Sequence, residues 1–441
     1  MLVLLLLGRL IYVSEASSNV PIMDYWNYLN GLVVKAYTGG VSFSDLNSFN
    51  GIHKTPYQLI LFLFNIKIFH WNTQISMYLG GLLLGLLTIY LYRIIIKSCS
   101  QNALLKQSAG ILIAVIVFSL GAYEIISQEF AFASAIRIFI FVILCEKTSV
   151  ILKKHNKMFD NDTLFLTLGY ILVINFIGGA YSVGFSVAIF IILIFDFVKN
   201  LINKLKVNRV NYIVLVMGLI VGDCMYMQGI NIGQGGSAVA GGLDTIKSFG
   251  EGLLIVGGAS LFGSNISIQF AYVVGFLVIL IHATLLFFYI KEKIYNATYF
   301  PAGLYAYSCV FYGMIFMGRG GFGVEYLLAS RYIVDSSLAI VADVMVLTIL
   351  FERIKTHKRI LNGFGICIAG FIILGVAHAD FDEIKMAPYR KLYCDNLIEI
   401  MLNIDDYTDE ELKEFQALSP QLVRDGVEIM KEYKLGVFAY K

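Results

Sequence analysis

Long apolar runs recur along this chain, and short polar segments separate them. A helix needs about 20 apolar residues to cross roughly 30 Å of hydrocarbon. We therefore predict about eleven transmembrane helices. They lie near residues 1–13, 74–96, 108–125, 130–146, 163–178, 180–198, 210–228, 269–290, 299–317, 335–351 and 360–379. The first run reaches only about 20 Å and contains Arg9, so it is an incomplete span, a full one with a missing start, or a cleaved signal segment.

Composition supports a membrane protein and excludes other classes. Of the 441 residues, 58% are apolar and only 15% are charged, whereas a soluble domain carries about a quarter charged residues. The formal net charge of +2 provides no overall field that would attract nucleic acid. The six cysteines form no CxxC pair, so we predict neither a disulfide framework nor a metal site.

Lysine and arginine collect in every second loop between these runs. Because cytoplasmic loops of membrane proteins are rich in Lys and Arg, the loops after the second, fourth, sixth, eighth and tenth runs are predicted to be cytoplasmic. With the adjacent span ends they hold Arg93, Lys97, Lys106, Lys147, Lys153, Lys154, Lys157, Lys199, Lys204, Lys206, Arg209, Lys291, Lys293, Arg353, Lys355, Lys358 and Arg359. This orientation places residues 380–441 outside the cell.

The long connecting segments all lie on the predicted outer face, at 14–73, 229–268 and 318–334. Long loops on a rigid scaffold usually carry function, so the site is expected on this face. Within the first segment, residues 56–71 are amphipathic and indicate an interfacial helix. We interpret the glycine-rich stretch from Gly233 to Gly242 as a flexible loop. The chain is thus predicted to be a transmembrane domain, 1–379, followed by an extracytoplasmic helical tail, 380–441.

Asp24 is the first candidate for chemistry. It follows the first run, in the sequence Asp24-Tyr25-Trp26, where the two aromatic rings indicate headgroup depth. A carboxylate there is suited to act as a general base towards a hydroxyl, with Tyr25 and Trp26 as candidate contacts to an acceptor or a sugar. The alternative is a solvated helix N-cap.

Two arginines lie on the predicted outer face, where positively charged residues are usually scarce. Arg319 lies in Gly318-Arg-Gly-Gly-Phe-Gly, and Arg331 lies beside Tyr332 in Ser330-Arg-Tyr. A guanidinium binds phosphate through two parallel hydrogen bonds and stays charged, so these residues with Tyr332 are candidate phosphate ligands. The alternative is a structural ion pair with Glu325 or Glu129.

His53 and Lys54 precede the predicted interfacial helix. They are candidate phosphate ligands or ordinary surface groups whose charged ends reach towards water.

Glu124, Gln128 and Glu129 cluster at the outer turn between the third and fourth runs. Ionisable groups at this depth line a cavity or pair with each other, and a structural ion pair between Glu129 and Arg137 is the alternative to a role in binding an acceptor or a sugar.

Several of these segments together resemble bacterial polytopic proteins similar to GT-C glycosyltransferases. The resemblance runs nearly end to end through short motifs: Asp24-Tyr-Trp, the Asn50 to Lys54 segment, Gly318-Arg-Gly-Gly-Phe-Gly with Ser330-Arg-Tyr, and Lys431-Glu-Tyr-Lys-Leu-Gly-Val-Phe. Where the family usually reads Asn-Glu-His-Arg, this chain reads Asn50-Gly-Ile-His-Lys. The resemblance implies a GT-C-like helical bundle and a sugar donor carried on a polyprenyl phosphate. It also implies an acidic residue of the first outer loop at the reaction centre.

We therefore expect an inverting membrane glycosyltransferase that acts on the outer face of a bacterial plasma membrane. Asp24 would be the base, and Arg319, Arg331, Tyr332, His53 and Lys54 would bind the donor phosphate. The acceptor would be a glycolipid, a wall polysaccharide or a teichoic acid, and a divalent cation could assist. Two alternatives remain open: a flippase or transporter of lipid-linked saccharide, and an envelope polysaccharide polymerase or ligase.

Overall fold

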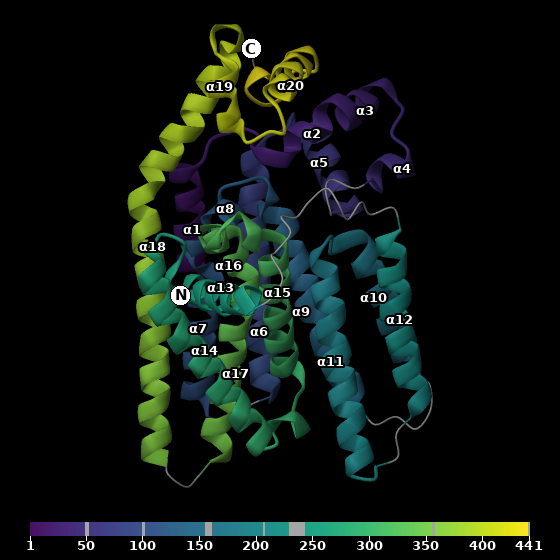
Figure 1. The fold of residues 1–441 in the computed structure, drawn as a ribbon, viewed down its shortest axis with the longest axis vertical. Helices are drawn as coiled ribbons and strands as arrows, with labels where there is room; N and C mark the ends of the chain where they lie inside the picture. The colour runs from purple at the N-terminus through teal and green to yellow at the C-terminus, as the bar shows by residue number, and fades with distance from the viewer. Residues whose placement is uncertain are drawn as a thin grey trace.

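Each predicted apolar run forms a helix (Figure 1). The computed structural model describes residues 1–48, 53–98, 102–154, 161–205, 208–228, 243–354 and 358–439, and within these ranges all regular elements are helical. The helices on the predicted runs are α1 (Leu2–Ala16), α6 (Thr73–Ser98), α7 (Ala103–Phe118), α9 (Phe130–Lys154), α10 (Asn161–Leu172), α11 (Tyr181–Ile202), α12 (Arg209–Met227), α14 (Ile268–Lys291), α15 (Phe300–Arg319), α17 (Leu338–Arg353) and α18 (Lys358–Leu402). The all-α prediction is confirmed.

In the described residues, eight helical segments are long and apolar enough to cross a membrane. They contain α6, α7, α11, α12, α14, α15, α17 and α18. The other three predicted spans are helical but do not meet both conditions. Helix α1 has 15 residues, α10 with its π turn covers Asn161–Ile177, and α9 carries Arg137, Glu146 and Lys147 along its length. The described helices thus support a multi-pass membrane protein, and the count of eleven stays a prediction.

Burial differs strongly between helices of the bundle. In the most apolar window of α17, 94% of the residues are buried, whereas only 28% are buried in the corresponding windows of α12 and α14. A helix that is apolar all round must be surrounded either by other helices or by lipid. Helix α17 is therefore the centre of the bundle, while α12 and α14 present exposed side chains such as Met217 and Phe276 on its outside.

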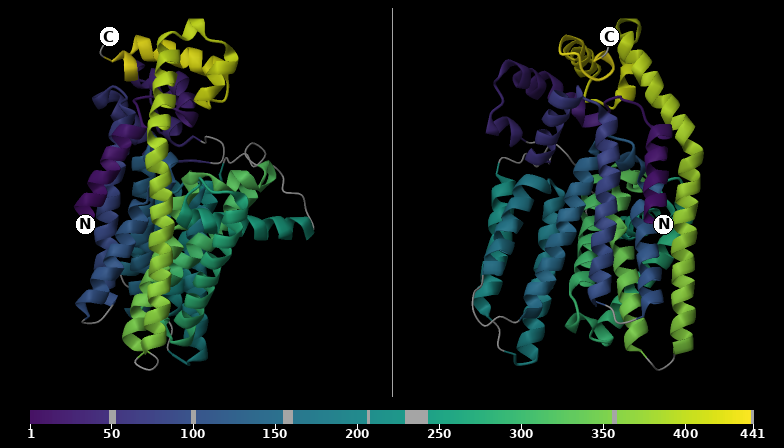
Figure 2. Two further views of the ribbon diagram at one scale, coloured as in Figure 1. Left: turned by 90° about the vertical axis from the view of Figure 1, so that its left-hand side faces the viewer. Right: turned by 180° about the vertical axis from the view of Figure 1, so that it is seen from behind.

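Helix α18 is longer than its predicted span. Its 45 residues correspond to about 68 Å, and it runs the whole height of the molecule (Figures 1 and 2). The domain boundary predicted after residue 379 falls inside this helix. Beyond that point Glu383 of α18 accepts hydrogen bonds from Tyr12 of α1 at 3.1 Å and from Arg390 at 2.8 and 2.9 Å. The hydrogen bond from Tyr12 joins this part of α18 to α1.

The first long loop and the C-terminal tail form one layer, here called the cap, at one end of the bundle (Figure 1). Trp26, Ile66 and Leu397 pack in its apolar core. The cap contains α2 (Trp26–Tyr28), α3 (Val34–Thr38), α4 (Phe43–Leu46), α5 (Pro56–Phe69), α19 (Asp409–Leu412) and α20 (Pro420–Glu432). Helix α5 confirms the helix predicted for residues 56–71. The tail is helical as predicted, but it shares a core with the first loop instead of forming a separate unit.

Helix α13 (Leu243–Phe262) occupies a segment predicted to be a loop. It projects sideways from the bundle (left view of Figure 2) and packs closely against α14. The close approach requires glycine, because a Cβ atom on Gly275 would lie 1.8 Å from the carbonyl oxygen of Leu254. The glycines in this region therefore serve helix packing, as small residues do in membrane proteins. The predicted flexible loop itself, Gly233 to Gly242, lies outside the described residues.

Candidate functional site

The connection from α15 to α17 positions both candidate arginines at the cap end of the bundle. It consists of three 3-10 turns, Gly320–Phe322, Val324–Leu328 and Ser330–Tyr332, followed by α16 (Ile333–Ser336). Gly323 has a φ of 109°, which side-chain-bearing residues rarely adopt, so glycine is needed between the first two turns. The turns bring the end of α15, with Arg319, close to the segment that carries Arg331.

Glu124 fixes Arg331. This carboxylate lies on α8 (Tyr123–Ile126) and accepts hydrogen bonds from the Ser330 hydroxyl at 2.9 Å and the Arg331 backbone N–H at 3.0 Å. It also forms an ion pair with the Arg331 guanidinium at 3.2 Å. The predicted partners, Glu325 and Glu129, are wrong, because the tight turn at Ser330 places Arg331 beside α8.

A second cluster, centred on Arg137, lies deeper between the helices. Both terminal nitrogens of Arg137 donate to the two carboxylate oxygens of Asp335, at 2.5 and 2.8 Å. Tyr307 donates to the same carboxylate at 2.5 Å, and the Arg137 guanidinium lies 4.1 Å from the centre of the Tyr181 ring. The alternative of an ion pair between Glu129 and Arg137 is therefore wrong. Sequence reasoning missed both Asp335 and Tyr181, although a charged residue at the start of an apolar run is a signal that could have found Asp335.

Asp24 lies within the electrostatic reach of Arg319 and Arg331. It occupies the 3-10 turn Met23–Tyr25, and its side chain is exposed. Desolvation by the surrounding protein raises its pKa, while the positive charges of Arg319 and Arg331 oppose this rise. The carboxylate and the two guanidiniums, about 300 residues apart in the chain, therefore share one region at the cap end.

Arg319 differs from the other two arginines because it makes no ion pair within the described residues. Its guanidinium carbon lies 5.8 Å from the ring centre of Phe322. The donors of Arg319 are therefore available to an anion.

His53 faces the same region as a neutral group. Desolvation, together with the charges of Arg137 and Arg319, lowers its pKa to about 4. Its Nδ1 atom accepts a hydrogen bond from the backbone N–H of Ala180 at 3.4 Å, so the remaining proton is carried by Nε2. Gly179 makes this contact possible, because its φ is 53° and a Cβ atom there would lie 3.2 Å from Nδ1. His53 is therefore a neutral hydrogen-bond donor and contributes no positive charge at neutral pH.

Lys54 and Tyr332 are used in packing. The Lys54 ammonium is buried, donates to the backbone oxygen of Met225 on α12 at 3.2 Å and lies 5.3 Å from the ring centre of Tyr226. Tyr332 is buried, with its ring centre 5.4 Å from the Arg331 guanidinium. Lys54 thus attaches the first loop to α12, and Tyr332 supports Arg331.

Tyr25 and Trp26 are buried in the cap on one side of Asp24. Tyr25 packs on Phe62 and Phe130, with ring centres 5.2 and 4.7 Å away. Trp26 is fully buried against Phe415 of the tail, and its indole N–H donates to the Pro21 backbone oxygen at 3.2 Å. These residues anchor the turn that carries Asp24, and their rings are not exposed to a sugar.

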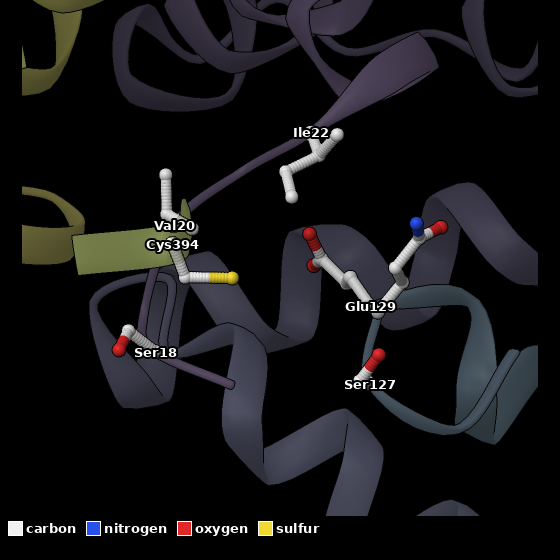
Figure 3. Close-up of a pocket in the computed structure, with 7 residues that line it drawn as sticks. Ser18, Val20, Ile22, Ser127, Glu129 and Cys394 are labelled. Carbon is white, nitrogen blue, oxygen red and sulfur yellow. The ribbon is translucent and has the colours of Figure 1, made fainter. Parts of the chain in front are cut away.

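Glu129 lies in a separate small pocket beneath the first loop (Figure 3). Its Oε2 atom accepts a hydrogen bond from the Trp71 indole at 2.8 Å, and Oε1 has no partner in the described part of the chain. Burial raises the pKa of Glu129 to about 8. In Figure 3 its carboxyl group points towards the thiol of Cys394 on α18. The remaining lining residues are Ser18, Val20, Ile22, Ser127 and Gln128.

The structure thus brings together Asp24, Arg319, Arg331, Glu124 and His53, and it assigns packing contacts to Lys54, Tyr332, Tyr25 and Trp26. Among the described residues, His, Cys, Asp and Glu side chains form no group of three that could hold a metal ion. Comparisons with family models, with curated proteins and with solved structures give no match.

Proposed function

We propose that this protein is an integral-membrane glycosyltransferase that moves a monosaccharide from a polyprenyl-phosphate-linked donor to a cell-envelope acceptor. The observation that carries the proposal is the position of the exposed Asp24 carboxylate within the field of Arg319 and Arg331. Transfer from a glycosyl phosphate needs a base for the acceptor and cations for the departing phosphate. The proposed site provides both, at the end of the bundle that we predict to lie outside the cell from the distribution of basic residues.

In the proposed reaction, the acceptor hydroxyl attacks the anomeric carbon while Asp24 removes its proton. The new bond forms on the face opposite the phosphate, which inverts the anomeric configuration. The bond between the anomeric carbon and the phosphate oxygen breaks, and its electron pair goes to the phosphate. Arg319 stabilises the developing charge with its guanidinium donors, and Arg331 assists from the position that Glu124 fixes.

His53 would contact the donor as a neutral group. A neutral imidazole with its proton on Nε2 donates one hydrogen bond, to a sugar hydroxyl or to a phosphate oxygen. Because it carries no charge, it does not compete with the arginines for Asp24. In this proposal His53 orients the donor, and the arginines provide the positive charge.

The test is an assay of sugar transfer in proteoliposomes by Asp24→Asn and by a matched control, Asp45→Asn, which changes a cap carboxylate paired with Lys35. Loss of a general base costs about 100-fold or more in rate. We expect this loss for Asp24→Asn, with an unchanged thermal midpoint, and near-normal transfer for the control. Full transfer by Asp24→Asn would reject the mechanism. Activity only with a diphosphate-linked oligosaccharide would reassign the protein as a polymerase or ligase.

A transporter of lipid-linked saccharide is the second candidate, and one observation favours it. Within the bundle, Nδ1 of His282 lies 2.7 Å from an oxygen of Asp343, and Tyr305 donates to the same carboxylate at 2.6 Å. Ionisable residues inside a membrane often mark transport pathways. Movement of labelled lipid across liposomes without a glycosidic product, abolished by Asp343→Asn, would select this candidate.

A further inference from the structure

The pocket around Glu129 lies where three distant parts of the chain meet (Figure 3). Val20 and Ile22 of the first loop form one wall, Glu129 directly before α9 forms the second, and Cys394 of α18 forms the third. The space is large enough for about one water molecule. Only 7% of Glu129 is exposed, and its Oε1 atom has no hydrogen-bond partner in the described part of the chain. The pocket thus contains a buried carboxyl oxygen that the surrounding residues leave unused.

The first wall leads directly into the 3-10 turn Met23–Tyr25, here called the Asp24 turn, because Ile22 is the residue before it. Met23 has a φ of 65°, a left-handed conformation that a residue with a side chain keeps only when its surroundings hold it. The position of Asp24 therefore depends on the packing of the segment that closes the pocket.

Two series of aromatic contacts also join Glu129 to this turn. Phe130 follows Glu129, and its ring centre lies 4.7 Å from that of Tyr25. In the second series, the Trp71 indole donates to Oε2 of Glu129 at 2.8 Å. Trp71 packs edge-on against Phe62 with ring centres 5.3 Å apart, and the Phe62 ring lies 5.2 Å from that of Tyr25. Glu129 is thus connected to the Asp24 turn by packed rings as well as by the pocket wall.

The charged groups near the pocket are engaged away from the Glu129 carboxyl. The titratable residues around the pocket are, on the first loop and on α18, Tyr25, Arg390, Lys391, Cys394 and Asp395. Lys391 and Asp395 both contact the Ser18 hydroxyl in the first loop. Burial of Glu129 with a single hydrogen bond therefore raises its pKa to about 8.

An ionised Glu129 does not fit the pocket as it stands. A buried carboxylate with a single donor is costly, because a charge in a protein interior needs partners or water. Ionisation would therefore draw about one water molecule into the pocket, or it would move the wall formed by Val20 and Ile22 outward. Either response changes the packing behind the Asp24 turn, whereas a protonated carboxyl requires no such change.

We propose that Glu129 is a positioning residue that links the Asp24 turn to a proton: with the proton bound, its carboxyl holds the turn in place, and without the proton the pocket wall loosens. The effect on sugar transfer rests on the proposed function, whereas the movement of the turn does not. Transfer should decrease as the pH rises through about 8, because the ionised form no longer fixes Asp24 near Arg319 and Arg331.

The two tryptophans of the chain report on the two ends of this connection. Trp71 donates to Glu129, and Trp26 directly follows the Asp24 turn. The full-length protein is labelled with 5-fluorotryptophan, and its two fluorine-19 NMR resonances are followed from pH 6 to pH 9.5, in parallel with sugar transfer in proteoliposomes. We expect both resonances to shift with a midpoint near pH 8. Transfer should fall about tenfold between pH 7 and pH 9.5.

Three variants isolate the role of the proton. Glu129→Gln keeps an acceptor for Trp71 but cannot ionise, so it should abolish both shifts and the alkaline decrease in transfer. Glu129→Ala removes the acceptor and should lower transfer at every pH. The matched control is Asp395→Asn, which replaces an exposed carboxylate of α18 and should retain both shifts.

The outcomes separate this inference from the proposed function. Coupled shifts without sugar transfer at any pH support the link between Glu129 and the turn, and they reject the transferase. A shift of the Trp71 resonance alone, or of neither resonance, overturns the link. Shifts that persist in Glu129→Gln assign the titration to another group and overturn it as well. Coupled shifts with transfer that stays constant to pH 9.5 overturn the positioning role and leave the transferase intact.

Discussion

The arginines at the cap end occupy two contrasting environments. Arg137 is buried, Asp335 neutralises its charge through two hydrogen bonds of 2.5 and 2.8 Å, and the Tyr307 hydroxyl accepts a third at 3.1 Å. Arg319, in contrast, is partly exposed and makes no ion pair within the described residues, although it acts on the pKa of Asp24. The two regions adjoin, since both guanidiniums lower the pKa of His53.

The difference between these two environments distinguishes an arginine with a structural role from one that is available to bind a ligand. A buried ion pair stabilises a fold only while both partners are present, because the desolvation cost of each charge is large. An arginine without a partner at a site of partial exposure has donors left for an anion. The same residue type therefore serves different purposes according to how many acceptors the fold places around it.

Removing the carboxylate that pairs with Arg137 should have the largest effect of all, and it should act on stability. Asp335→Ala leaves a buried guanidinium uncompensated, which costs about 3–5 kcal/mol. We expect a thermal midpoint in detergent that is lower by many degrees, together with poor recovery from the membrane. Glu325→Ala, which removes an exposed carboxylate from the same connection, is the control and should change the midpoint little. Equal midpoints for the two variants would contradict the structural role of Asp335.

Arg319→Ala should leave folding intact and weaken use of the donor. A hydrogen bond to a charged group contributes about 1.5–3 kcal/mol, which corresponds to roughly 10- to 100-fold in the KM for the lipid-linked donor. Arg319→Lys should recover part of this loss, because lysine keeps the charge but not the planar fork. Arg353→Ala, at the other end of the bundle, is the control. Donor kinetics that do not change in Arg319→Ala would place the phosphate elsewhere.

Glu129 represents an intermediate case, a buried carboxyl with only one of its two oxygens hydrogen-bonded within the described residues. Its folded-state pKa is raised to about 8 from an ordinary 4.5, so the folded protein binds the proton more tightly than the unfolded chain. The stability that the group contributes is complete below pH 4.5 and is lost as the pH rises through 8. We expect the thermal midpoint to fall by about 2–4 °C or more between pH 5 and pH 8.5.

Glu129→Gln retains an acceptor for Trp71 and removes the titration. Its thermal midpoint should vary less across the same pH interval than that of the unchanged protein. Parallel pH profiles for the two proteins would show that Glu129 does not titrate in this interval.

The smallest expected effect concerns His53. Because its pKa is lowered to about 4, the imidazole is neutral from pH 5.5 to pH 8. The pH profile of sugar transfer should therefore be the same in this interval for the unchanged protein and for His53→Gln, which keeps a neutral donor. His53→Ala should lower transfer by several-fold without changing the shape of the profile. An inflection near pH 6.5 that His53→Gln removes would mean that His53 titrates there as an ordinary imidazole.

The sequence alone determined the helical class and the placement of the apolar helices. Each predicted run became a helix, since hydrophobicity over about 20 residues is a local property that no distant contact needs to supply. The sequence also identified Asp24, Arg319 and Arg331 as a group, through their residue types and their position in long connections.

The tertiary structure decided which charges pair and which stay open. Nothing local in the chain relates Arg137 to Asp335 or Arg331 to Glu124, because these partners lie about 200 residues apart and meet only when the helices pack. Helix α13 was missed because its glycines suit a loop in isolation, and only the close approach of α14 gives them another purpose. Side-chain pairing and helix packing depend on which segments meet in the folded structure. Neither the hydrophobic pattern nor the residue types specify that.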